Sequence, residues 1–261
     1  MLNYFQAIVL GIIQGVTEWL PISSQAMVFL FGRLFFDLGH IDALGVSIWL
    51  HSGTLLAAVV YFWKDILRIL TSDKKMLKFL ILATMMSGLV AAPFLLILLK
   101  IELPMAIFTI IIGALLLTIS FLQKRSRELK IGEKSLILLG PRDGLIVGAI
   151  QGLAVLPGLS RSGLTIATFL AQKYSLKNAF YLSFLMSIPI IFLAQIALPI
   201  FEREFVVSPT LLVGALTSGL VGFATIRALL QFAQRVNFFK ATLILGIMVV
   251  FVGVVLLFFN I

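Results

Sequence analysis

Residues 14–25 read QGVTEWLPISSQ and lie in the middle of an apolar N-terminal region. This stretch carries a carboxylate, Glu18, a helix-breaking Pro21, and two adjacent hydroxyls, Ser23 and Ser24. Backbone groups that a break frees at membrane depth must be buried in protein or line a water-filled cavity. An acid beside such a break therefore predicts a hairpin of two short helices with a polar tip.

The composition places this hairpin in a membrane protein. Hydrophobic residues make up 61% of the 261 residues and charged residues 12%, whereas soluble proteins have about 45–50% and about 25%. Apolar runs of about 20 residues, long enough to span a bilayer as helices, recur along the chain. The chain has no cysteine, which excludes disulfides and thiolate chemistry.

We therefore predict an all-α integral membrane protein with six full spans. Two further apolar regions, 1–32 and 144–172, are interrupted by Pro, Gly and Ser near their centres. Each interrupted region is typical of a re-entrant hairpin, which enters and leaves the membrane on the same side. The predicted spans are 43–63, 77–99, 104–122, 177–200, 209–232 and 238–259.

The basic residues predict the orientation. The net charge is +9, and sixteen of the twenty Lys and Arg residues lie in the connections 64–78, 123–143, 173–177 and 227–240. The positive-inside rule places these connections in the cytoplasm and both termini outside. The first hairpin then enters from outside and the second from the cytoplasm. The bias explains the positive charge without a nucleic-acid partner.

A short repeat supports two related units. GIIQG at 11–15 matches GAIQG at 148–152. The first unit is predicted over 1–122 and the second over 144–261, with a cytoplasmic loop at 123–143. Because the units start on opposite sides, the repeat is inverted, and such folds place a substrate site where the two breaks meet. The alternative is a chance similarity between glycine-rich segments.

Two charged residues fall at membrane depth, Glu18 in the first hairpin and Arg161 in the second. An ionisable group inside the bilayer costs at least about 2.5–3.5 kcal/mol on insertion scales, and it marks a candidate functional site. One charge of each sign, one in each hairpin, predicts that both face a shared cavity. The alternative is an ion pair that only locks the hairpins together.

The second hairpin carries PGLSRSG at 157–163. Free N–H groups at a helix start, serine hydroxyls and a guanidinium together form an anion site suited to phosphate. A carboxylate can face such a site if it holds a divalent cation or acts as a base. Gln14 lies one helical turn before Glu18, on the same face. The predicted binding residues are Gln14, Ser23, Gly158, Ser160, Ser162 and Gly163.

QGVTEWLPISS with PGLSRSG, in this layout, resembles the undecaprenyl-pyrophosphate phosphatase family of the bacitracin-resistance type, over essentially the whole chain. The resemblance implies removal of the terminal phosphate from a polyprenyl diphosphate, which recycles the lipid carrier for cell-wall glycans. It also implies Mg²⁺ or Ca²⁺, with Glu18 as metal ligand, and a multi-pass protein of the cell membrane whose site faces outside. It leaves a homodimer open.

One position departs from the family pattern. After the two serines the family commonly has Thr-Gly-His, whereas this chain has Gln25-Ala26-Met27. Methionine cannot transfer a proton. His51, in WLHSGTLLAA, is the one histidine of this chain that we expect at membrane depth. It is either a catalytic imidazole or a packing residue bonded to a backbone carbonyl.

Two functions compete. In a diphosphatase, Ser24 or water attacks the terminal phosphorus, Glu18 is base or metal ligand, and Arg161 stabilises the developing charge. In a transporter of an anionic isoprenoid lipid or small phosphate compound, the same broken helices serve alternating access. The region LAVLPG, which corresponds to the first break, has no acid. This chemical asymmetry favours hydrolysis.

Overall fold

The computed structural model describes residues 2–100, 103–128, 134–201, 206–236 and 238–259. All the named elements within these ranges are helices. Six helical segments are long and apolar enough to cross a membrane, which confirms the prediction of an all-α integral membrane protein. They are α3 (His40–Trp49) continued by α4 (His51–Tyr61), α6 (Lys74–Lys100), α7 (Met105–Glu128), α10 (Leu176–Phe201), α11 (Pro209–Arg235) and α12 (Phe238–Phe258).

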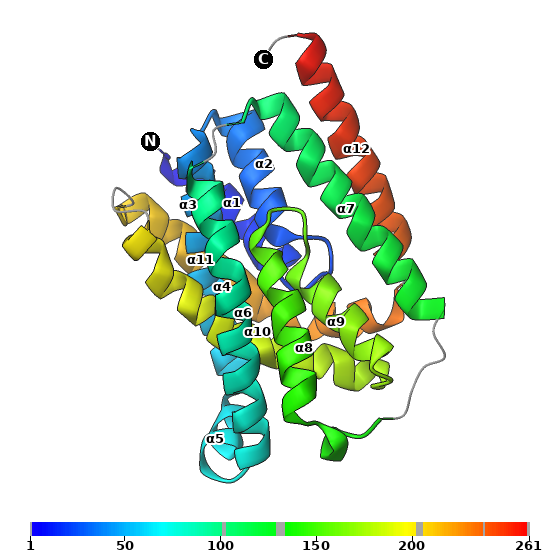
Figure 1. The fold of residues 1–261 in the computed structure, drawn as a ribbon. Coiled ribbons are helices and arrows are strands. Elements are labelled where there is room, and N and C mark those ends of the chain that lie inside the picture. The colour runs from blue at the N-terminus through cyan, green and yellow to red at the C-terminus, as the bar shows by residue number, and fades with distance from the viewer. Residues whose placement is uncertain (1, 101–102, 129–133, 202–205, 237, 260–261) are drawn as a thin grey trace.

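The two interrupted regions form pairs of short helices. The first pair is α1 (Tyr4–Thr17) with α2 (Ser24–Phe36), and the second is α8 (Pro141–Gly152) with α9 (Arg161–Ala171). The connection between α1 and α2 lies beside the connection between α8 and α9 near the middle of the molecule (Figure 1). The two connections touch directly, because the Gly158 N–H donates a hydrogen bond to Ser23 Oγ at 3.2 Å.

Small residues bring the first helix of each pair against a long helix. α1 packs on α11, and a Cβ at Gly15 would lie 2.8 Å from the Ser218 carbonyl oxygen. α8 packs on α6, and a Cβ at Gly152 would lie 2.7 Å from the Ser87 carbonyl oxygen. Glycine at these positions therefore allows the close backbone approach common between membrane helices.

The helix contacts follow a paired pattern. α1 packs on α11 as α8 packs on α6, and α7 packs along α12. Two units related by a two-fold axis would give such pairs. The inverted relation and the division into 1–122 and 144–261 stay predictions, and residues 129–133 of the predicted loop lie outside the described ranges.

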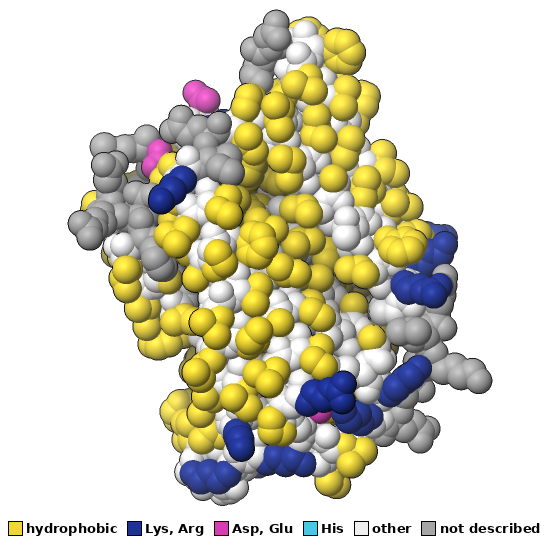
Figure 2. Space-filling model, in the orientation of Figure 1, with side chains coloured by type: hydrophobic (Ala, Val, Ile, Leu, Met, Phe, Trp, Pro, Cys, Tyr) yellow, Lys and Arg dark blue, Asp and Glu magenta, His cyan; other side chains and the backbone are white. Residues whose placement is uncertain are grey.

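The sequence missed one helix. The predicted connection 64–78 contains α5 (Trp63–Thr71), which folds back along α6. Tyr181 of α10 donates to Asp65 at 3.0 Å, and Arg68 donates to the same carboxylate at 2.8 Å. α5 is thus tied to α10. Figure 2 shows Lys and Arg side chains gathered at the end of the molecule where α5 meets α6, below a largely apolar surface.

Candidate active site

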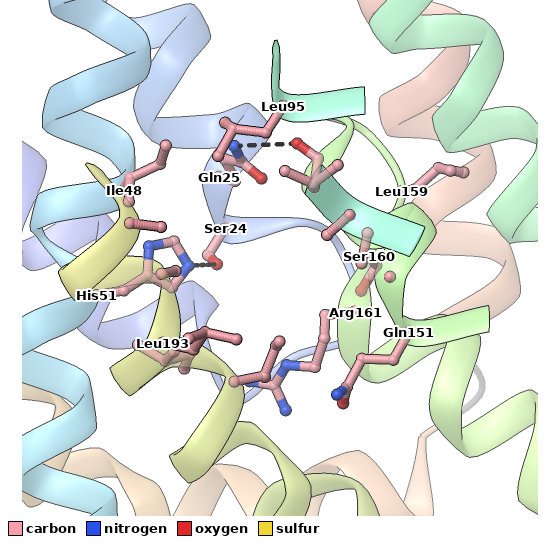
Figure 3. A pocket seen from close by; sticks show the side chains of 18 of the residues that line it. Ser24, Gln25, Ile48, His51, Leu95, Gln151, Leu159, Ser160, Arg161 and Leu193 are labelled. Carbon is pink, nitrogen blue, oxygen red and sulfur yellow. Dashed lines mark hydrogen bonds between the residues drawn. The ribbon is translucent and has the colours of Figure 1, made fainter. Parts of the chain in front are cut away.

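The tips of the two hairpins border a cavity of about 370 Å³. Most of its polar residues come from the two tips and from the start of α4, and α10 adds Gln195. Its apolar wall comes mainly from α6 and α10. Figure 3 shows Ser24 and His51 on one side of the cavity, with Ser160 and Arg161 on the other. The polar residues that line it include Glu18, Ser23, Ser24, Gln25, His51, Gln151, Ser160, Arg161 and Ser162.

Glu18 is the centre of the polar contacts, and its residue surface is only 5% exposed. Its Oε1 accepts a hydrogen bond from Arg161 Nη2 at 2.5 Å. Its Oε2 accepts from Ser24 Oγ at 2.7 Å and lies 3.1 Å from His51 Nε2. The structure therefore brings together the four residues that the sequence assigns to catalysis.

Arg161 is fixed from three sides. Besides Glu18, its guanidinium donates to the Ser183 carbonyl at 3.1 Å and lies 5.8 Å from the centre of the Phe184 ring. The Ser183 hydroxyl bonds in turn to Thr165 Oγ1 at 2.7 Å, and both residues are fully buried. Sequence reasoning missed Ser183 and Phe184. No side-chain signal was available for Ser183, because it holds Arg161 through its backbone carbonyl.

His51 faces the carboxylate because a backbone carbonyl orients its ring. The Ser47 carbonyl lies 2.6 Å from His51 Nδ1 and can only accept, so Nδ1 carries a proton. This contact directs Nε2 toward Glu18 and toward Ser24 Oγ, which is 3.4 Å away. The structure thus places His51 in the site and also gives it the backbone hydrogen bond that the packing alternative requires.

Met27, which replaces the expected histidine, does not reach the cavity. It lies on α2 and packs against a buried apolar cluster that includes Phe29 and Leu44. It is absent from the lining of the cavity. The imidazole next to Glu18 therefore comes from α4 rather than from α2.

The predicted binding residues divide into two groups. Ser23, Ser160 and Ser162 line the cavity. Gln14 is fully buried behind Glu18, where its Nε2 donates to Glu18 Oε2 at 3.0 Å and to Thr54 Oγ1 at 3.4 Å. Gln14 therefore supports the carboxylate and does not form part of the cavity wall.

Two glycines of the second hairpin also support the site from behind. Gly158 has φ +105°, a left-handed conformation that glycine adopts readily, and its N–H is used by Ser23. The Gly163 N–H donates to Ser160 Oγ at 3.2 Å, which caps α9. The N–H groups of Gly158 and Gly163 are therefore not available to bind an anion. Fewer backbone donors remain near the start of α9 than the sequence analysis predicted.

The site offers few protein ligands for a divalent cation. In the described part of the chain, no group of three or more His, Asp and Glu side chains comes together. Glu18 is the single carboxylate among the described residues that line the cavity. The buried Gln14 Oε1 beside it has no hydrogen-bond partner among the described atoms. This donor set fits a hard cation that takes its remaining ligands from phosphate oxygens and water, as Mg²⁺ commonly does.

Comparisons with known proteins identify the family of this chain. A family model described as bacitracin resistance protein BacA matches residues 7–255. An undecaprenyl-diphosphatase of Methanococcoides burtonii is 36% identical over 264 residues, covering 95% of this chain and 97% of the relative. Undecaprenyl-diphosphatases of Saccharolobus solfataricus and Thermodesulfovibrio yellowstonii are each 32% identical, covering 97% and 88% of this chain and 97% and 89% of the relatives. This chain therefore belongs to the BacA family.

Proposed function

We propose that this protein is an integral-membrane phosphatase that hydrolyses undecaprenyl diphosphate to undecaprenyl phosphate and inorganic phosphate, which recycles the lipid carrier. One observation carries the proposal: a buried carboxylate contacts a hydroxyl, an imidazole and a guanidinium at the edge of a cavity with an apolar wall. The hydroxyl and the guanidinium can bind a phosphate group, and the apolar wall can bind an isoprenoid chain. The names of the relatives support the same substrate.

In the proposed reaction, Ser24 Oγ attacks the terminal phosphorus. Its proton passes to Glu18, which already accepts its hydrogen bond. The bond between the terminal phosphorus and the bridging oxygen breaks, and the lipid monophosphate leaves. Glu18 gives this proton to the leaving lipid monophosphate. Water then attacks the phosphorus of the phosphoserine, with Glu18 or His51 accepting the proton of the water. The bond from phosphorus to Ser24 Oγ breaks, Ser24 regains a proton, and inorganic phosphate leaves. Direct attack by water, oriented by Ser24, is the alternative.

Arg161 supplies the charge stabilisation. Its guanidinium is held by Ser183 and Glu18 before any substrate arrives, so little reorganisation is needed. Ser160 and Ser162 add hydroxyl donors beside it. When bound, Mg²⁺ or Ca²⁺ would offset the negative charge that the diphosphate brings next to Glu18, with Glu18 and Gln14 Oε1 as its protein ligands.

We also propose that the protein lies in the cell membrane with both termini and the cavity facing outside. The clustering of Lys and Arg at one end of the molecule supports this orientation (Figure 2). Because the chain has no native cysteine, single cysteines can be introduced and labelled. A cysteine at Lys124 should resist a membrane-impermeant thiol reagent in intact cells, and labelling there from outside would contradict the orientation.

The test of the function is phosphate release. Purified protein in detergent should release phosphate from undecaprenyl diphosphate when Mg²⁺ or Ca²⁺ is present and stop when the metal is chelated. A transporter would move the lipid or a phosphate compound in sealed vesicles without releasing phosphate. No contact in the described residues favours transport over hydrolysis. Absence of phosphate release under all metal conditions would overturn the proposal.

A further inference from the structure

A second apolar groove lies next to the active-site cavity, along the same pair of helices. It has a volume of about 340 Å³ and is formed by α5, α6 and α10. Its walls are apolar except for Thr84. None of Glu18, Ser24, His51 and Arg161 lines this groove, and the proposed reaction does not use it.

The groove and the cavity follow one another along the α6–α10 boundary. On α6, the groove is lined from Leu77 to Met85, and the cavity from Gly88 to Leu95. On α10, the groove is lined from Leu185 to Pro189, and the cavity from Ile190 onward. Residue numbers rise in the same direction on both helices. A single apolar track therefore begins at the polar tips and runs toward α5.

A long isoprenoid chain needs more room than the cavity provides. The α6 wall of the cavity, Gly88 to Leu95, is about 10 Å long at a rise of 1.5 Å per residue. Including the groove, the α6 wall extends from Leu77 to Leu95, about 27 Å by the same rise. Eleven isoprenyl units in extended form cannot fit within the shorter length, so part of the chain must lie beyond the cavity.

The position of α5 gives the groove its third wall. Ile66 and Ile69 of α5 face the groove, and the contact of Asp65 with Tyr181 holds α5 against α10. A simple connection between α4 and α6 would leave this side of the track open to lipid. The fold-back of α5 thus adds a third apolar wall to the boundary between α6 and α10.

We propose that the α5–α6–α10 groove binds the distal part of the substrate's isoprenoid chain and selects for long polyprenyl diphosphates. This inference rests on the proposed function. The diphosphate lies at Glu18 and Arg161, and the chain runs between α6 and α10 toward the end of the molecule where Lys and Arg gather. Binding along the groove adds apolar contact only for long chains.

The experiment compares two substrates of equal headgroup, undecaprenyl diphosphate and farnesyl diphosphate, with full-length protein in detergent micelles. Thr84→Trp and Leu77→Trp fill the groove near to and far from the cavity. Leu89→Trp is the control, because Leu89 is 70% exposed on the same helix and lines neither space. Turnover of farnesyl diphosphate reports whether each variant is folded.

Thr84→Trp should raise the KM for undecaprenyl diphosphate about tenfold, the loss expected when roughly two methylene-sized groups lose apolar contact. Its KM for farnesyl diphosphate should not change. Leu77→Trp should have a smaller effect of the same kind, and Leu89→Trp none. Equal changes for both substrates, or no change for either in Thr84→Trp, would overturn the groove assignment. A wild-type protein that releases phosphate from neither substrate would instead overturn the proposed function, and with it the groove.

Discussion

The two hairpins use the same packing and carry different chemistry. In each, a Gly-x-x-x-Gly segment with glutamine before its second glycine sets the first short helix against a long helix. Gln14 donates to Glu18, one turn further along. Gln151, at the matching place, donates to Ser87 Oγ on α6 at 2.9 Å, and the residue one turn after it is Val155.

The hairpins therefore share the residues that position them and differ in the residues that line the site. The shared glycines position both tips at the centre of the molecule, where Ser23 meets Gly158. The first tip then supplies the carboxylate and the Ser24 hydroxyl, which is the nucleophile in the proposed reaction, and the second tip supplies the Arg161 guanidinium. A packing scheme used twice has thus produced one site with two unlike halves, which suits chemistry with a direction.

The largest expected effect comes from removing either charge. Glu18→Gln and Arg161→Ala should each lower kcat by at least about a thousandfold, because the base or the charge stabilisation is lost. Each should also lower thermal stability, since removing one partner of a buried pair leaves the other uncompensated. Steady-state phosphate release and thermal unfolding measure the two effects.

The double variant Glu18→Gln with Arg161→Gln distinguishes a catalytic ion pair from one that only holds the two hairpins together. It should recover much of the lost stability, because no unpaired charge remains, while staying inactive. If the pair were only a structural lock, activity would recover with stability.

We expect a smaller loss of activity from changing His51, which lies on α4 and not on either hairpin. His51→Ala should lower kcat by about a hundredfold or more, the range for loss of a general acid–base group. Stability should fall only slightly, since the ring is partly exposed at the cavity. Met27→His should not rescue it, because Met27 packs among apolar residues away from the cavity. Full activity of His51→Ala would remove His51 from the mechanism.

The shared packing is tested by stability and not by activity. Gly15→Val and Gly152→Val should each lower the free energy of unfolding by about 1–3 kcal/mol, as overpacking does. Gly39→Ala is the control, since a Cβ there would lie 3.5 Å from its nearest neighbour, Asp42 Oδ2. Destabilisation by only one of the two valine variants would break the claim that both hairpins pack alike.

The smallest effect concerns the metal. Gln14→Glu adds a second carboxylate beside Glu18, which should reduce the Mg²⁺ concentration for half-maximal activity by about tenfold or less. Titration of phosphate release with Mg²⁺ measures this, and Gln14→Leu, which removes Oε1, should shift it the other way. Identical titrations for wild type and both variants would exclude Gln14 as a ligand.

The membrane fold could be predicted from the sequence because hydropathy and chain breaks report directly on it. The structure contains the six spans, and Glu18 and Arg161 both line one cavity while also forming an ion pair. Gln14 could not be placed, because being on the same helical face as Glu18 does not say which of the two reaches the cavity. Gly163 was assigned to anion binding because a sequence does not show that Ser160 uses its N–H.

The parts that the sequence missed depend on tertiary contacts. Ser183 holds Arg161 through its backbone carbonyl, which every residue type has, so no side-chain pattern marks it. α5 is short and rich in charge, and it is helical where it packs along α6. Sequence alone predicts a loop for such a segment, because its helix depends on packing against α6.

The central claim is that one diphosphate binds between the two tips, and a non-hydrolysable methylene-bisphosphonate analogue of the polyprenyl substrate tests it most directly. With Mg²⁺ present, the analogue should raise the Tm of the wild-type protein. It should raise the Tm much less in Glu18→Gln, a change in the first hairpin, and in Arg161→Ala, a change in the second. A Tm increase as large as that of the wild type in either variant would contradict a site shared by both hairpins.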